Sequence, residues 1–143
     1  MRPHEEEALS EEAQPPALRP AVPILFVRDV AAAAQFYRDS LGFAVEFLYG
    51  EPPFYGEIKR DGAVLHLRHV HEPNFAELAA REESLILATI LVSDVRALYA
   101  EFAGRGVEFA QELQTQQWGG TDFHVLDPDG NCISFVSYQA PNA

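Results

Sequence analysis

Hydrophobic and polar positions alternate along this chain with strand-like and helix-like periods, and the order of the periods repeats. An apolar run at 21–27 predicts a strand, and the proline near its start favours an edge position in a sheet. Asp29 suits a helix N-cap, and residues 30–40 follow it with helical spacing that turns Phe36 and Tyr37 inward. Further strands are expected at 43–49, 54–60 and 63–70.

The second half of the chain repeats this order after a connecting helical segment at 72–83. An apolar strand is expected at 85–92, and Asp94 suits the N-cap of a helix at 95–103. In that helix the pair Leu98-Tyr99 is expected to take the place of the inward pair of the first helix. Three strands should follow, at 107–113, 121–126 and 132–136.

The repeat has a measurable spacing. Asp94 follows Asp29 by 65 positions, and a turn at Gly62 is echoed at Gly130, 68 positions later. We therefore predict an α+β fold of two tandem βαβββ modules that form curled mixed sheets. Each module alone would leave one face of a short sheet exposed, so the two should share a core or pair with another chain. The expected modules span about 21–70 and 85–138.

Length and composition fit one globular domain. The 143 residues are 48% hydrophobic, no apolar run is long enough for a membrane span, and the N-terminus does not resemble a secretory signal. Residues 1–20 are acidic and proline-containing and are expected to be a flexible tail, with the domain at 21–138 and a short tail at 139–143. The single Cys132 cannot form an internal disulfide, so a cytoplasmic location is expected.

The formal net charge of −12 disfavours partners that need a basic surface, namely nucleic acid and anionic membranes. It suits a cationic ligand, although high solubility alone explains it equally well. The sequence contains no phosphate loop, dinucleotide fingerprint or recognisable nucleophile–base pair, and no cofactor is expected.

Several motifs together resemble a known family. They are Val27-Arg28-Asp29-Val30, Phe36-Tyr37, Leu41-Gly42-Phe43 and the turn Asp127-Pro128-Asp129-Gly130-Asn131. Within a tandem βαβββ pattern they resemble the vicinal oxygen chelate superfamily, also called the glyoxalase/bleomycin-resistance/dioxygenase fold, over residues 21–138. The further match at Gln117-Trp118-Gly119 is most similar to the bleomycin resistance proteins of that superfamily.

The resemblance implies a metal position that this chain does not fill. Enzymes of the superfamily hold a divalent metal with residues of the first and last strands of each module, which fall at about Val22, His66, Ala88 and Ser134. Only His66 binds a metal well, and neither of the predicted first strands contains His, Glu, Asp or Cys. A metal-dependent lyase, isomerase or dioxygenase is therefore disfavoured.

The resemblance also implies a ligand cleft. Trp118 would be a stacking platform whose ring has room because of the glycines at 119 and 120, although it could instead fold back onto the core. Strand alternation places His66 and Arg68 on the face opposite Leu65 and Leu67, whereas His69 and His71 are expected to be solvated at the strand end. Phe43 could line the cleft or belong to the core. The candidate ligand-binding residues are Phe43, Phe47, Tyr49, Phe54, Tyr55, His66, Arg68, Trp118, Gly119, Asp122 and Ser134.

The expected function is binding without catalysis. The protein would be a metal-free homodimer of the bleomycin-resistance type, with a bulky cationic or planar ligand, such as a glycopeptide antibiotic, sequestered in an acidic, aromatic-lined cleft. One alternative is an enzyme that uses His66, with Glu57 or another residue of the cleft, for proton transfer, or that recruits a metal through other side chains. Another alternative is a binder of an unrelated metabolite.

Overall fold

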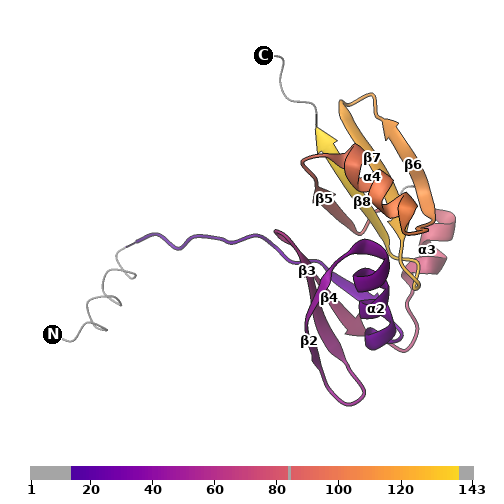
Figure 1. The fold of residues 1–143 in the computed structure, drawn as a ribbon. Helices are drawn as coiled ribbons and strands as arrows, with labels where there is room; N and C mark the ends of the chain where they lie inside the picture. Colours follow the sequence, from indigo (N-terminus) through magenta and orange to yellow (C-terminus); the bar gives the residue numbers. More distant parts are fainter. Residues whose placement is uncertain (1–13, 84, 139–143) are drawn as a thin grey trace.

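The computed structural model describes residues 14–83 and 85–138, and it has the predicted repeat of elements (Figure 1). The first half comprises β1 (Ile24–Val27), α2 (Val30–Leu41), β2 (Ala44–Tyr49), β3 (Tyr55–Arg60) and β4 (Ala63–His69). A short helix, α3 (Phe75–Arg81), connects it to the second half. This half comprises β5 (Ala88–Leu91), α4 (Val95–Gly104), β6 (Phe109–Thr115), β7 (Gly120–Leu126) and β8 (Cys132–Tyr138).

The two halves have the same sheet topology. The strand orders are β1-β4-β3-β2 and β5-β8-β7-β6, with β1 parallel to β4 and β5 parallel to β8. The first strand of each half therefore lies at a sheet edge, as the early proline predicts for β1. The α+β class and the two mixed sheets are confirmed.

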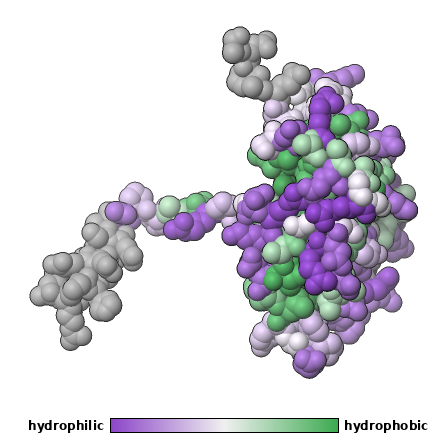
Figure 2. Space-filling view, in the orientation of Figure 1, coloured by the Kyte–Doolittle hydropathy of each residue, from purple (hydrophilic) through white to green (hydrophobic). Residues whose placement is uncertain are grey.

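Residues 14–22 are exposed and lead into β1 as a narrow extension from the rest of the molecule (Figure 2). The face of the molecule shown in Figure 2 has a polar band between apolar patches. The predicted tails at 1–20 and 139–143 lie mainly outside the described residues. None of the helices among residues 14–83 and 85–138 is long and apolar enough to cross a membrane.

Capping residues set the helix ends. Asp29 accepts a hydrogen bond from the Ala32 amide and Asp94 accepts one from the Ala97 amide, each at 3.0 Å, so both predicted N-caps are formed. Gly42 ends α2 with a φ of 74°, a left-handed conformation that glycine adopts without steric cost.

Helix α2 packs on one face of the first sheet and α4 on one face of the second (Figure 1), and we call the opposite face of each sheet its open face. The largest core side chain of α2 is Tyr37, and its counterpart in α4 is Phe102; both are fully buried. The predicted match of Tyr37 to Tyr99 is wrong, because Tyr99 lies three positions too early and is only half-buried. Phe102 instead packs edge-on against Phe135 at 5.3 Å.

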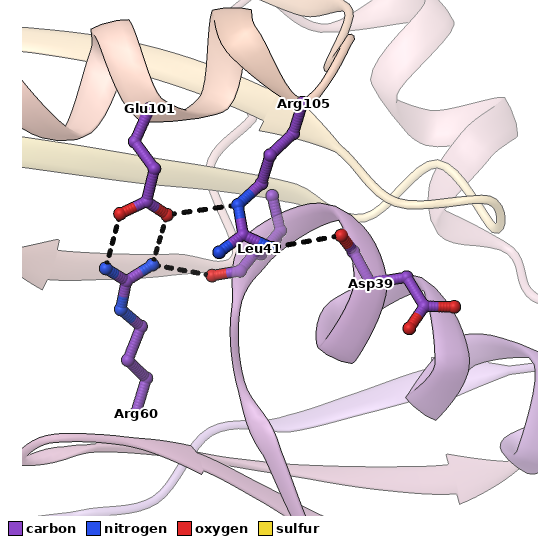
Figure 3. Close-up of polar contacts among 5 residues, drawn as sticks. All are labelled: Asp39, Leu41, Arg60, Glu101 and Arg105. Atoms are coloured by element: carbon purple, nitrogen blue, oxygen red, sulfur yellow. Dashed lines mark hydrogen bonds and ion pairs between the residues drawn. The ribbon is translucent and has the colours of Figure 1, made fainter.

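Two polar contacts join the halves. In the first, the guanidinium of Arg60 forms two hydrogen bonds of 2.8 Å to Glu101 of α4 and one of 2.9 Å to the carbonyl of Leu41 (Figure 3). Arg105 approaches the same carboxylate at 3.3 Å and donates to the carbonyl of Asp39. Hydrogen bonds from Arg60 are the main reason that the pKa of Glu101 lies below its usual value.

The second contact is the turn between β7 and β8. Asp127 accepts hydrogen bonds from the amides of Asp129 and Asn131, from the Asn131 side chain and from the Tyr37 hydroxyl of α2. Asn131 also donates to the carbonyl of Phe26 at 3.0 Å. Burial raises the pKa of Asp127 despite these donors, and burial together with Asp127 raises that of Tyr37.

Candidate functional site

The open face of the first sheet carries a hydrogen-bonded chain of three polar side chains. The Nδ1 atom of His66 lies 2.8 Å from the Tyr55 hydroxyl, and its Nε2 atom lies 2.9 Å from Oε1 of Glu57. A neutral imidazole protonated on Nε2 satisfies both contacts, because it donates to the carboxylate and accepts from the phenol. We call these three residues the relay.

Strand register places the relay in the middle of the sheet. His66 pairs with Ile24 on one side and with Glu57 on the other, and Glu57 pairs with Phe47. Paired residues project from the same face, so these four side chains form a row across the sheet. The Phe47 ring lies 6.3 Å from the His66 ring in an edge orientation.

A second row lies beside the first. Tyr49 pairs with Tyr55, Tyr55 with Arg68, and Arg68 with Phe26. The Arg68 guanidinium lies 4.7 Å above the Phe54 ring and donates to the carbonyl of His69. The open face of the first sheet is therefore aromatic around a polar centre.

One of the two histidines expected to be solvated at the end of β4 differs from expectation. His69 is half-buried rather than solvated, because its Nδ1 atom lies 2.7 Å from the carbonyl of Arg28 and its ring lies 5.1 Å from that of His71. His71 is exposed.

The open face of the second sheet carries the other predicted polar residues, and these are buried. Asp122 is 4% exposed and accepts hydrogen bonds from Gln111 at 2.8 Å and Gln116 at 2.9 Å. His124 Nε2 lies 3.4 Å from the second Asp122 oxygen and has no hydrogen bond among the described residues. Ser134 pairs with His124 across the strands and is also buried.

Sequence reasoning missed His124 and the two glutamines. The pattern Asp122-x-His124 on a strand places both side chains on one face, and this alternation was the available signal. The glutamines come from β6 and from the loop after it, and no local pattern indicates that they bond to Asp122.

Trp118 is 58% exposed at the end of this face, and its ring lies 5.7 Å from that of Tyr138. A Cβ atom on Gly120 would come within 2.0 Å of the indole, so Gly120 is the glycine that accommodates the ring. Of the two glycines expected to relieve crowding, Gly119 supplies a backbone φ of 102° and a Cβ there would meet nothing within 4 Å.

Phe43 is a core residue. It is 4% exposed and packs edge-on against Tyr37 at 5.9 Å, which favours the core alternative over a cleft wall. Cys132 is buried, and burial raises the pKa of its thiol, which disfavours the reactive thiolate.

The sequence matches a known family model. The model of the glyoxalase/bleomycin resistance protein/dioxygenase superfamily matches residues 19–135. The chain belongs to this superfamily.

Individual relatives point to one branch of the superfamily. A bleomycin resistance protein of Geobacillus stearothermophilus is 29% identical over 126 residues, which span 80% of this chain and 93% of the relative. The bleomycin-binding protein of Streptomyces verticillus, solved with copper(II)-bleomycin, is 28% identical with a TM-score of 0.68, covering 86% of this chain and 98% of that one. The bleomycin resistance determinant of transposon Tn5 has the same TM-score at 22% identity, covering 86% and 100%, and supports the fold alone.

The residues present do not fit the superfamily's metal position. In the first strand of each half, the partner of His66 is Ile24 and that of Ser134 is Thr89, whereas Ala88, predicted at this position, faces the core. Ile24 offers no ligand atom, and the Thr89 hydroxyl is a poor ligand beside imidazole or carboxylate. Within residues 14–83 and 85–138, no three His, Cys, Asp or Glu side chains are grouped so as to hold a metal ion.

The predicted site residues therefore lie on two separate open faces. The first face carries Phe47, Tyr49, Tyr55, His66 and Arg68, with Phe54 beside it, and the second carries Trp118, Asp122 and Ser134. A groove of about 790 Å³ lies between the halves, along β5, α4 and the turn between β3 and β4. Phe43 is the one predicted ligand residue that lines it.

Proposed function

We propose that this protein binds a bulky cationic or planar molecule of the bleomycin type and protects its target by sequestration. No bond of the ligand is made or broken, no metal of the protein takes part, and the binding occurs in the cytoplasm. The observation that carries this proposal is the 28% identical relative solved with copper(II)-bleomycin, which shares the fold over nearly its whole length.

The open faces support an aromatic-lined site. Large apolar side chains that remain exposed are concentrated there, and an aromatic floor suits a flat ligand. The exposed residues on the first face are Ile24, Phe26, Phe47 and Tyr49, and those on the second are Leu91, Trp118, Leu126 and Tyr138. The net charge of −12 would attract a cationic ligand to the protein.

A homodimer would complete this site. Each open face carries large apolar side chains that remain exposed among the described residues, and such a face gains stability from a partner. We propose that the first face of one copy lies opposite the second face of the other, so that the relay and Trp118 border one cleft. Sedimentation equilibrium of the full chain should give the mass of two copies.

Titration with bleomycin tests the function. Metal-free bleomycin is added up to about 100 μM, a range that saturates a site of micromolar Kd, while the fluorescence of Trp118 is recorded. Trp118 is the single tryptophan, so a saturable change reports on the second face. Calorimetry with metal-free and copper(II)-bleomycin provides a second readout that does not depend on this residue.

Two results would overturn the proposal. One is a folded protein that shows neither heat nor a fluorescence change with either form of bleomycin. The other is a stoichiometric metal ion in protein purified without chelator, which would favour an enzyme of the superfamily.

A proton-transfer function is the second candidate, because His66 is bonded to Glu57 on one nitrogen and to Tyr55 on the other. This is the arrangement of a base oriented by a third group. Recovery of the ligand after prolonged incubation distinguishes the candidates: sequestration returns it unchanged by mass spectrometry and chromatography, whereas an enzyme returns a product.

A further inference from the structure

We infer that Glu57, held by the relay at the centre of the first open face, recognises a planar cation that carries N–H donors, such as an amidinium or a protonated amino-heterocycle. This inference rests on the proposed function, since it names the part of the ligand that the first sheet takes. It assigns His66 and Tyr55 as positioning residues and Glu57 as the direct contact.

The hydrogen bonds of the relay leave one strong acceptor free. Both nitrogens of His66 are used, so the imidazole cannot bond to a ligand without losing a partner. Within the described residues, no donor is hydrogen-bonded to the second carboxylate oxygen, Oε2 of Glu57. The Glu57 side chain is 27% exposed, so part of it can be reached by a ligand.

The neighbours of Glu57 favour a flat group. Phe47 is its direct strand partner, and Tyr49 and Tyr55 form the adjacent pair on the same face. A planar ligand can stack on these rings while its edge donates to the carboxylate, and a positive charge strengthens both interactions.

Positive side chains set the position and orientation of such a ligand. Lys59 and Arg68 lie on the same face, two residues from Glu57 and His66 respectively. Arg68 already stacks on Phe54 and donates to a backbone carbonyl. Their positive charges repel a ligand cation and so restrict it to the central position at Glu57. The positions beside Lys59 and Arg68 suit hydrogen-bond acceptors of the ligand.

The buried carboxylate of the second open face is not an equivalent acceptor. Asp122 is also a strand carboxylate, but one of its oxygens accepts from both Gln111 and Gln116, and the other faces His124. It is buried, and a ligand would have to displace these partners first. Of these two strand carboxylates, Glu57 is therefore the more available to a ligand.

Benzamidine and its neutral analogue benzamide test the inference on the full chain. Both are flat and nearly equal in size, and they differ in charge. NMR chemical shifts of the His66 and Tyr55 rings are followed during titration into the roughly millimolar range expected for a small fragment. We expect benzamidine to bind about tenfold more tightly than benzamide, with the largest shifts at the relay.

Variants identify the contact. Glu57→Gln should weaken benzamidine about tenfold and leave benzamide nearly unchanged, because it removes the charge and keeps the shape. Tyr55→Phe keeps the aromatic floor and frees Nδ1 of His66, so we expect a loss of about two- to fivefold. Glu46→Gln is the matched control, since Glu46 is an exposed carboxylate on the neighbouring strand β2.

Equal affinity for the two probes, no shifts at the relay, or an unaltered Glu57→Gln variant would overturn the inference. NMR spectra of each variant verify that it is folded. The test is independent of bleomycin: failure of bleomycin to bind, with benzamidine recognised at Glu57, would remove the proposed function and keep the inference. Bleomycin binding that Glu57→Gln does not alter would remove the inference and keep the proposed function.

Discussion

The two halves of the molecule share one topology but use their polar residues differently. All six buried polar or charged residues among the described part of the chain belong to β7, β8 and the turn between them. They are Thr121, Asp122, His124, Asp127, Asn131 and Ser134. In the first half, the equivalent strands carry the relay, whose side chains remain partly exposed.

This difference separates the buried polar groups that hold the structure together from the partly exposed groups to which we assign ligand recognition. Asp127 and Asn131 tie the second half to α2 and β1, and Asp122 is held by side chains of its own half. Glu57 has no such covering. A repeated fold can therefore commit the polar groups of one copy to stability and leave those of the other for a ligand.

The largest expected effect is at the turn between β7 and β8. Asp127→Ala removes the acceptor of four hydrogen bonds and leaves the buried Tyr37 hydroxyl without its partner. We expect the free energy of unfolding to fall by about 3–5 kcal/mol in urea titrations at pH 7.

The matching turn of the first half provides the control. Asp61 is exposed with a φ of 51°, a conformation that asparagine tolerates, so Asp61→Asn should change stability by less than about 0.5 kcal/mol. Comparable losses in the free energy of unfolding at the two turns would show that the second half does not rely on its polar turn residues more than the first half does.

The sequence predicted the fold well because the repeat is a local signal. Asp29 and Asp94 cap the helices as expected, and the order of helices and strands along the chain follows the tandem pattern. The match of Tyr37 to Tyr99 was wrong because it followed residue type, whereas the spacing of 65 that relates the two N-caps leads to Phe102. Geometry, not chemical similarity, decides which side chain fills an equivalent core position.

The next largest effect compares the two strand carboxylates. Asp122→Ala leaves two glutamine amides without their acceptor in a buried site, and we expect a loss of about 1–3 kcal/mol in the free energy of unfolding. Glu57→Gln keeps its size in a partly exposed site and should cost less than about 1 kcal/mol. A larger loss for Glu57→Gln would make the relay a structural element rather than a recognition site.

The candidate site was less predictable than the fold. Alternation along β4 placed His66 correctly on the face opposite Leu65 and Leu67. It could not show that Tyr55 and Glu57 reach the two nitrogens of His66, because those contacts depend on the register between β3 and β4. The bonds to Asp122 likewise depend on how β6 curls, which involves two register shifts.

The charged contact between the halves should have a smaller effect. Arg60→Ala removes a bidentate ion pair and a hydrogen bond to a helix-end carbonyl, and we expect a loss of about 1–2 kcal/mol. Arg105→Ala removes a longer, more exposed contact and should cost less than about 0.5 kcal/mol. Thermal unfolding of both variants at low and high salt checks this ranking. Added salt should reduce the difference between the two stability losses but leave the loss for Arg60→Ala the larger one.

The smallest effect is a pH dependence that has opposite signs at the two contacts between the halves. Burial raises the pKa of Asp127, so the folded state binds its proton more tightly than the unfolded state does. Its contribution to stability is complete below about pH 4, the ordinary range of the carboxyl, and is lost as pH rises through the folded pKa. Arg60 lowers the pKa of Glu101, so that contribution is present above about pH 4.3 and is lost as pH falls.

Urea unfolding at pH 7 and pH 3 of the wild type, Asp127→Asn and Glu101→Gln separates the two titrations. On acidification, the stability advantage of the wild type over Asp127→Asn should grow, while its advantage over Glu101→Gln should shrink. The second change should be modest, because the Glu101 side chain is 35% exposed and solvent screens its ion pair. If both differences moved in the same direction, the buried turn and the charged contact would not be distinct kinds of junction.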